Sequence, residues 1–112
     1  MIKIKIQRQK NKIIYFEIKG HANFSEYGED VICAAVSSVG QMTVNGLIET
    51  LKLKKKLKFT EEDGYIFCDL KNSGLTDDEL ENADILVESM YSYLKDVAKS
   101  YKNFVKLREI KK

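Results

Sequence analysis

Apolar and polar side chains alternate along the first part of the chain. This period of two is typical of a strand with one buried face, and it occurs in two runs, Ile2-Ile4-Ile6 and Ile14-Phe16-Ile18. The polar residues from Arg8 to Lys12 predict a turn between these runs. The pattern therefore predicts a hairpin whose second strand leads to Gly20 and His21 at the edge of a sheet.

After residue 30 the apolar residues recur at helical spacing, which predicts a helix from Val31 to about Leu51. Its predicted sheet-facing residues are Ile32, Ala35, Val36, Val39 and Met42. Gly40 and Gly46 interrupt the pattern, and each costs about 1 kcal/mol relative to alanine inside a helix. Close backbone packing at the two glycines would compensate for this cost, and simple tolerance is the alternative.

Two further strands are predicted around the turn Glu62-Asp63-Gly64, one at Leu57 and Phe59, the other at Ile66, Cys68 and Leu70. Thr76-Asp77-Asp78-Glu79 is a capping-box pattern that begins a long helix. The residues predicted to form the buried stripe of this helix are Leu80, Ala83, Val87, Met90, Leu94, Val97 and Tyr101. A last strand is expected at Phe104, Val105 and Leu107.

These elements predict one α+β domain over residues 1–112, with two helices packed against a mixed or antiparallel sheet in the order ββαββαβ. A chain of 112 residues can bury a single core of ordinary size. Tyr91 and Tyr93 could extend contacts to a partner chain, and ordinary amphipathic surface is the slightly favoured alternative.

Composition narrows the class of protein without indicating a ligand. Hydrophobic residues make up 44% and charged residues 32%, which is typical of a globular chain, and the net charge is only +2. The run Lys54-Lys55-Lys56 favours a solvated connection over a nucleic-acid patch, so direct nucleic-acid binding is not expected.

The cysteine count and the apolar runs indicate where the protein works. Two cysteines, Cys33 and Cys68, make no disulfide framework, and no signal segment opens the chain, so a reducing cytoplasm is expected. No apolar run is expected to reach the length of a membrane span. With one histidine and two cysteines, a complete zinc site would need carboxylates or a second subunit, so neither a metal nor another cofactor is expected.

The segment from Gly20 to Ser37 carries the candidate chemistry. It places the only histidine, His21, before a loop and Cys33 after it. Asp30 is a good N-cap residue, which would make Cys33 the third helical residue, near N–H groups and a dipole that favour a thiolate. Ser37 follows Cys33 by one helical turn on the same face.

Each of these residues also has a structural interpretation. A lone cysteine is commonly a small buried apolar residue, a lone histidine is commonly structural, and an aspartate at this point can simply cap a helix. Cys68 alternates with apolar strand residues and is interpreted as structural. Spacing alone leaves both interpretations of Cys33 and His21 open.

The strings Gly-His-Ala and Gly-x-Asp-x-x-Cys-Ala-Ala-Val-Ser resemble the signature of the bacterial ribosomal-processing cysteine protease family, Prp. The resemblance implies that Cys33 is the nucleophile and His21 the general base. It also implies supporting or substrate-binding roles for the motif positions that fall on Gly20, Gly28, Asp30 and Ser37.

The resemblance further implies a homodimeric cysteine endopeptidase. Its substrate would be the N-terminal extension of large-subunit ribosomal protein twenty-seven, with apolar and aromatic residues before the cut. The alternative is a noncatalytic ribosome-assembly or RNA-binding module, supported only by mild basicity and scattered lysines.

Overall fold

The structure is a computed structural model that describes residues 1–20 and 29–112, and the side chains of residues 29 and 30 lie outside this description. Along the described chain the elements are β1 (Ile2–Gln9), β2 (Lys12–Lys19), α1 (Glu29–Asn45), the π-helical turn η1 (Gly46–Thr50), β3 (Lys58–Glu62), β4 (Tyr65–Asp69), α2 (Asp77–Ser100) and β5 (Val105–Lys111). The predicted order ββαββαβ is confirmed, with η1 continuing α1.

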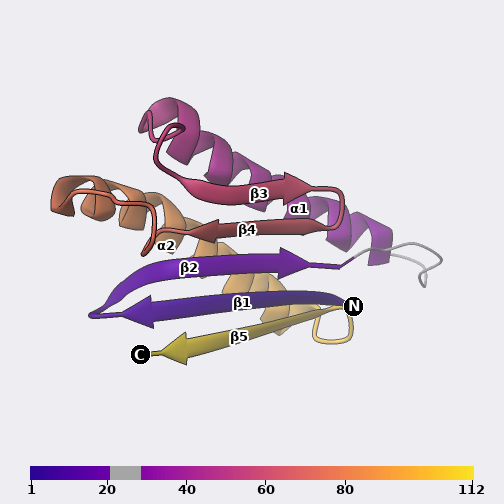
Figure 1. The fold of residues 1–112 in the computed structure, drawn as a ribbon. Helices are drawn as coiled ribbons and strands as arrows, with labels where there is room; N and C mark the ends of the chain where they lie inside the picture. The colour runs from indigo at the N-terminus through magenta and orange to yellow at the C-terminus, as the bar shows by residue number, and fades with distance from the viewer. Residues whose placement is uncertain (21–28) are drawn as a thin grey trace.

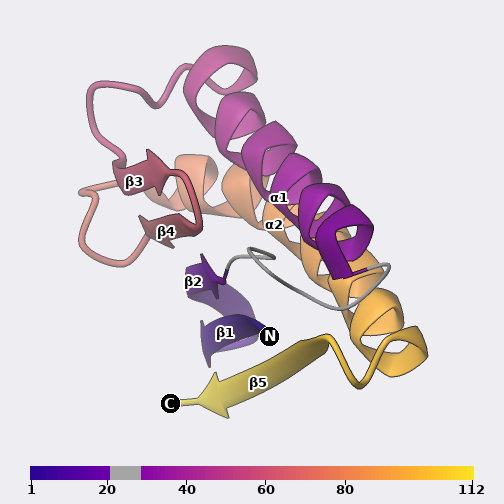
Figure 2. The same cartoon turned by 90° about the vertical axis from the view of Figure 1, so that its right-hand side faces the viewer.

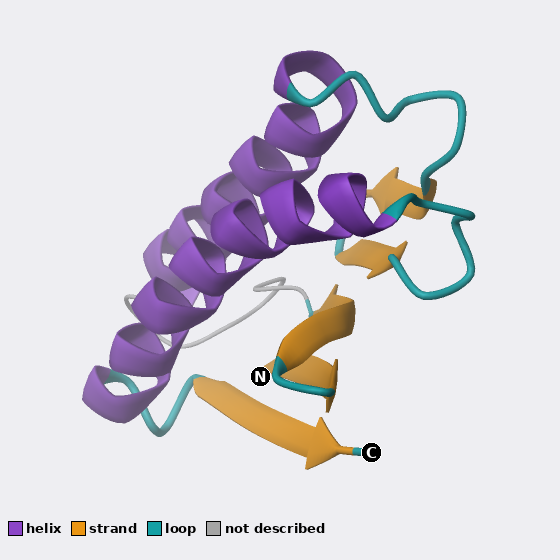
Figure 3. Cartoon of the chain, turned by 90° about the vertical axis from the view of Figure 1, so that its left-hand side faces the viewer, coloured by secondary structure: helices purple, strands orange, loops and turns teal. Residues whose placement is uncertain are grey.

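The strands form one mixed sheet in the order β3-β4-β2-β1-β5 (Figure 1). Neighbouring strands are antiparallel except β1 and β5, which are parallel. Both helices lie on the same side of this sheet (Figures 2 and 3). Among the described residues, the second face of the sheet is therefore not covered by a helix.

The first hairpin turn is tighter than predicted. β1 and β2 are separated only by Lys10 and Asn11, whose φ angles are 51° and 67°. Two central residues with positive φ form the turn type whose twist matches that of the flanking strands. Arg8 and Lys12 therefore belong to the strands, and the predicted turn over residues 8–12 was too long.

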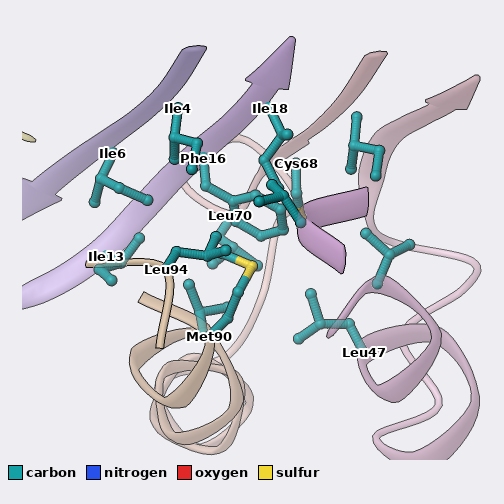
Figure 4. Close-up of a cluster of buried hydrophobic side chains, with 14 of the residues drawn as sticks. Ile4, Ile6, Ile13, Phe16, Ile18, Leu47, Cys68, Leu70, Met90 and Leu94 are labelled. Atoms are coloured by element: carbon teal, nitrogen blue, oxygen red, sulfur yellow. The ribbon is translucent and has the colours of Figure 1, made fainter. Parts of the chain in front are cut away.

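The core lies between the sheet and the two helices (Figure 4). The inward residues of the strands meet the inner faces of α1, η1 and α2, and the buried side chains labelled in the figure are Ile4, Ile6, Ile13, Phe16, Ile18, Leu47, Cys68, Leu70, Met90 and Leu94. The period-two pattern thus predicted most inward strand residues correctly, but Ile13 joins the core in place of the predicted Ile14. The strand register shifts there, since Gln7 pairs with Tyr15 and Arg8 pairs with Ile13.

The predicted inner face of α1 was partly wrong. Val36 is buried, but Ala35 is exposed and Met42 is 68% exposed. The helix turns Gly40 and Val44 toward the sheet instead. A Cβ atom at Gly40 would lie 2.8 Å from Ile18 Cδ1, so the missing side chain allows a close approach. The predicted close packing at the helix glycines is confirmed.

α2 begins where the capping box predicts, but its buried face ends at Val97, before the predicted Tyr101. The Thr76 hydroxyl accepts a hydrogen bond from the Glu79 N–H at 3.1 Å, and the Glu79 carboxylate accepts one from the Thr76 N–H at 2.9 Å. Both bonds satisfy donors that a helix start leaves unpaired. Tyr101 is the C-cap and is 44% exposed, so its predicted burial was wrong.

One prediction about apolar runs also needs correction. The stretch Val31–Thr50 has the length and mean hydropathy, 1.5, of a membrane span. This is weak evidence for a membrane, because a helix that forms one layer of a folded domain passes the same test. Here Val36, Val44 and Leu47 of this stretch are packed in the core.

Candidate active site

Helix α1 begins at Glu29, two residues before the predicted start. Asp30 therefore lies inside the first turn rather than at the cap, and Cys33 is the fifth helical residue rather than the third. Since Cα–Cβ bonds tilt toward the helix N-terminus, the Cys33 thiol still projects back toward the first turn.

Cys33 contacts the end of β2. Its thiol donates a hydrogen bond to the carbonyl oxygen of Gly20, with 3.8 Å between sulfur and oxygen. The Gly20 N–H in turn donates to the carbonyl oxygen of Gly64 at 3.0 Å. Gly20 thus joins the start of α1 to the turn between β3 and β4.

Only glycine fits the backbone at Gly20. Its φ is 140°, and a Cβ atom there would lie 2.6 Å from the Met1 carbonyl oxygen and 2.9 Å from Ile2 Cα. Both obstacles are backbone atoms, which cannot rotate away as a side chain can. The close approach holds the end of β2 against the start of β1 and fixes one wall of the site.

A cleft of about 330 Å³ opens beside Cys33, within the usual size range of a ligand site. Its floor includes Ile2, Ile18 and Ile66, the buried inward residues of three neighbouring strands. Ser37 and Gln41 continue the helical wall at successive turns after Cys33. The predicted alignment of Cys33 and Ser37 on one helix face is therefore seen in the cleft.

The opposite wall was missed by the sequence analysis. It is the β3–β4 hairpin end, and its lining residues are Glu61, Glu62, Asp63, Gly64 and Tyr65. The Asp-Gly turn was visible in the sequence, but no sequence pattern reveals that β4 pairs with β2, the pairing that brings the turn beside Gly20.

Cys68 has a different environment from Cys33. Cys68 is fully buried, and burial raises the pKa of its thiol to about 12, with a smaller contribution from Asp69. Cys33 is half-buried and lines the cleft, and both cysteines are free. The structural interpretation of Cys68 is confirmed, and Cys33 is the thiol that a substrate can reach.

His21 and Gly28 lie outside the described residues, as does the side chain of Asp30. Of the predicted site residues, the structure thus brings Gly20, Cys33 and Ser37 together around one cleft. Within the described parts of the chain, no three histidine, cysteine or acidic side chains are grouped so that they could hold a metal ion.

The sequence also matches a known family of cysteine proteases. Residues 1–106 match the family described as cysteine protease Prp. The chain belongs to this family. It is accordingly a cysteine protease, and the resemblance found in the segment from Gly20 to Ser37 extends over nearly the whole chain.

Relatives support the assignment in sequence and in structure. The ribosomal processing cysteine protease Prp of Bacillus subtilis is 35% identical over 92% of each chain. The crystal structure of SMU.848 from Streptococcus mutans superposes with a TM-score of 0.78 at 31% identity, covering 100% of this chain and 96% of that one. The S. aureus Prp structure with a covalently linked product peptide has a TM-score of 0.73 at 25% identity, covering 97% and 99%.

Proposed function

We propose that this Prp-family protease uses Cys33 as its nucleophile and His21 as its general base to remove the N-terminal extension of large-subunit ribosomal protein twenty-seven. The observation that supports this most directly is the contact between the Cys33 thiol and the carbonyl oxygen of Gly20. Gly20 immediately precedes His21 in the chain, so the same contact brings the sulfur to the segment that carries the imidazole.

The reaction proceeds through a thioester. His21 takes the proton of the Cys33 thiol, and the sulfur attacks the scissile carbonyl carbon. Backbone N–H groups of the first turn of α1 stabilise the negative oxygen that forms. The C–N bond then breaks, the amine leaves with the proton from His21, and water hydrolyses the thioester to release the acid and restore the thiol.

Asp30 and Ser37 have supporting roles in this proposal. Asp30 lies in the first turn of α1, where its charge either orients His21 or complements the helix dipole. Ser37 lines the cleft one turn after Cys33 and shapes the surface that receives the substrate. Replacing Asp30 with Asn separates the two roles of Asp30, because loss of orientation lowers kcat whereas loss of the dipole interaction lowers stability.

The substrate assignment rests on the cleft and on the relatives. Three isoleucines form an apolar floor beside the thiol, which suits the apolar and aromatic residues expected before the cut. The B. subtilis relative is named as a ribosomal processing protease, and an S. aureus relative holds a covalently linked product peptide.

The protein works as a homodimer in the bacterial cytoplasm in this proposal. The free state of both cysteines suits a reducing compartment. A groove between α1 and α2 supports dimerisation, because its lining holds Met42, Leu86, Met90 and Tyr93 and contains no charged side chain. Tyr93 is 51% exposed there, whereas Tyr91 binds Glu109 within the chain.

The test is cleavage of a synthetic peptide that copies the extension, followed by mass spectrometry. The parent protein and Cys68→Ala should release fragments, whereas Cys33→Ala and His21→Ala should release none. Circular dichroism establishes that each variant is folded. A folded Cys33→Ala protein that cuts the peptide at the parental rate would show that this proposal is wrong.

A further inference from the structure

The face of the sheet opposite the helices carries an unusual concentration of positive charge. Its outward residues form cross-strand rows, and one row places Lys19, Lys3 and Lys106 side by side on β2, β1 and β5. The next row places Lys5 between Glu17 and Arg108. Like charges on adjacent strands repel one another, so this arrangement costs stability unless an anion lies across it.

These cations surround a groove of about 440 Å³ that is separate from the Cys33 cleft. The groove contains a single carboxylate, Glu17, which pairs with Lys19 at 3.0 Å and raises the pKa of that lysine. The other four cations of the groove form no ion pair with the described residues: Lys3, Lys5, Lys106 and Arg108. With five cations and one carboxylate, the groove has an excess of four positive charges, which fits a polyanion.

An aromatic strip borders the groove on the same face of the sheet. The rings of Tyr15 and Phe67 are 6.0 Å apart, and those of Phe67 and Tyr65 are 5.9 Å apart. Lys5 lies 5.9 Å from the Tyr15 ring and Lys19 lies 5.4 Å from the Tyr65 ring, so the strip and the basic groove are continuous. Burial, with help from Glu17, raises the pKa of Tyr15 to about 12.

We infer that the open sheet face binds single-stranded RNA, with the phosphates along the basic groove and bases stacked on the aromatic strip. Aromatic side chains stack on unpaired bases of any sequence, while lysine and arginine neutralise the backbone. The chain thus has a nucleic-acid surface that its mild net charge did not predict, since the cations are gathered only by strand pairing.

A second copy of the chain fits this face poorly. A symmetric interface brings the same patch of both copies together, so the four unpaired cations would meet their equivalents. The uncharged groove between α1 and α2 has no such repulsion. The choice of RNA over DNA rests on the proposed ribosomal substrate, since a ribosomal protein is encountered together with RNA.

The test is fluorescence anisotropy of the parent protein with a labelled single-stranded RNA of mixed sequence over a salt series. Four neutralised phosphates predict a slope of log affinity against log salt of about −3. Lys106→Gln with Arg108→Gln should halve the slope. Phe67→Ala should weaken binding about tenfold without changing the slope, because it removes stacking rather than charge.

The matched control is Lys54→Gln with Lys55→Gln, which removes the same charge from exposed positions in the connection between η1 and β3. This control should bind RNA as the parent does. A parent that fails to bind at low salt, equal losses in both double variants, or a preference for DNA of the same sequence would overturn the inference. If the parent is a dimer and the double variant Lys106→Gln with Arg108→Gln is a monomer, the sheet face binds a second copy of the chain and the RNA inference is wrong.

This test is independent of peptide cleavage. Lys106 and Arg108 lie on the edge strand β5 and do not line the Cys33 cleft. Their double variant should therefore cut the extension peptide at the parental rate while it loses RNA. If the parent binds RNA but neither it nor the double variant cuts the peptide, the proposed protease substrate is wrong and the RNA-binding inference is supported.

Discussion

The Cys33 thiol donates a hydrogen bond to the carbonyl oxygen of Gly20, with 3.8 Å between the sulfur and the oxygen. Gly20 also donates its N–H to Gly64 in the β3–β4 turn. One residue without a side chain therefore connects three parts of the cleft: the helix that carries Cys33, the strand that leads to His21 and the β3–β4 turn. The geometry of the active site depends on this residue as much as on the cysteine.

Gly20→Ala should destabilise the fold by about 3 kcal/mol and abolish cleavage of the extension peptide. A side chain there is strained by the φ of 140° and would lie 2.6 Å from the Met1 carbonyl oxygen. Gly74→Ala is the control, since Gly74 has a φ of 69° with nothing within 4 Å. It should cost only about 1 kcal/mol in urea unfolding and keep activity. Equal costs would contradict the crowding argument.

Iodoacetamide should modify Cys33 and spare Cys68 in the folded protein near neutral pH. Cys33 lines the cleft, whereas Cys68 is fully buried with a pKa raised to about 12, so Cys68 remains a thiol. Mass mapping of the adducts over a pH series measures both rates. Denaturation should equalise them, and faster reaction of Cys68 in the native state would be the contrary result.

Acid should weaken the link between α2 and β5. Tyr91 donates a hydrogen bond to Glu109, and Arg8 adds a charged bond at 3.0 Å, which together lower the pKa of Glu109. Because the pKa of Glu109 is lowered by folding, the ionised carboxylate stabilises the fold at pH values above the ordinary pKa of 4.5. This stabilisation is lost as the pH falls below 4.5 and the carboxylate takes up a proton.

Glu109→Gln should therefore be less stable than the parent at pH 7 by about 1 kcal/mol or less, because the site is partly solvated. The difference should shrink as the pH approaches 3. Urea unfolding at several pH values measures it. Glu49→Gln, an exposed control on η1, should follow the parent throughout. A constant difference between Glu109→Gln and the parent would disprove the titration.

Met42→Glu should convert the proposed dimer into monomers. Met42 is 68% exposed and lines the uncharged groove between α1 and α2, so a carboxylate there would be buried against its equivalent in a symmetric interface. Sedimentation measures the mass. Ile110→Glu makes a similar change on the opposite face of the sheet and should leave the dimer intact. A parent that sediments as a monomer would refute dimerisation through this groove.

Predictions from local sequence signals succeeded, whereas those that depended on tertiary contacts failed. Period-two runs identified most inward residues of the strands, and the capping box located the start of α2, because both signals are local. The runs failed at Ile14, because the register shift that brings Ile13 into the core depends on the partner strand. The inner face of α1 was misjudged at Ala35 and Met42, since apolar residues surround this helix and only Gly40 permits the close contact with Ile18 and Ile66. Local periodicity contains no information about such a contact.

The sequence by itself determined the element order and the family, because these depend on spacing along the chain and on the motif from Gly20 to Ser37. Only the tertiary structure decided that β4 pairs with β2 and that β5 lies parallel to β1. The first pairing makes the β3–β4 turn a wall of the Cys33 cleft, and the second gathers distant lysines into one groove. Strand pairing joins residues far apart in sequence through backbone hydrogen bonds that every residue type can make, so side-chain patterns alone could not predict either site.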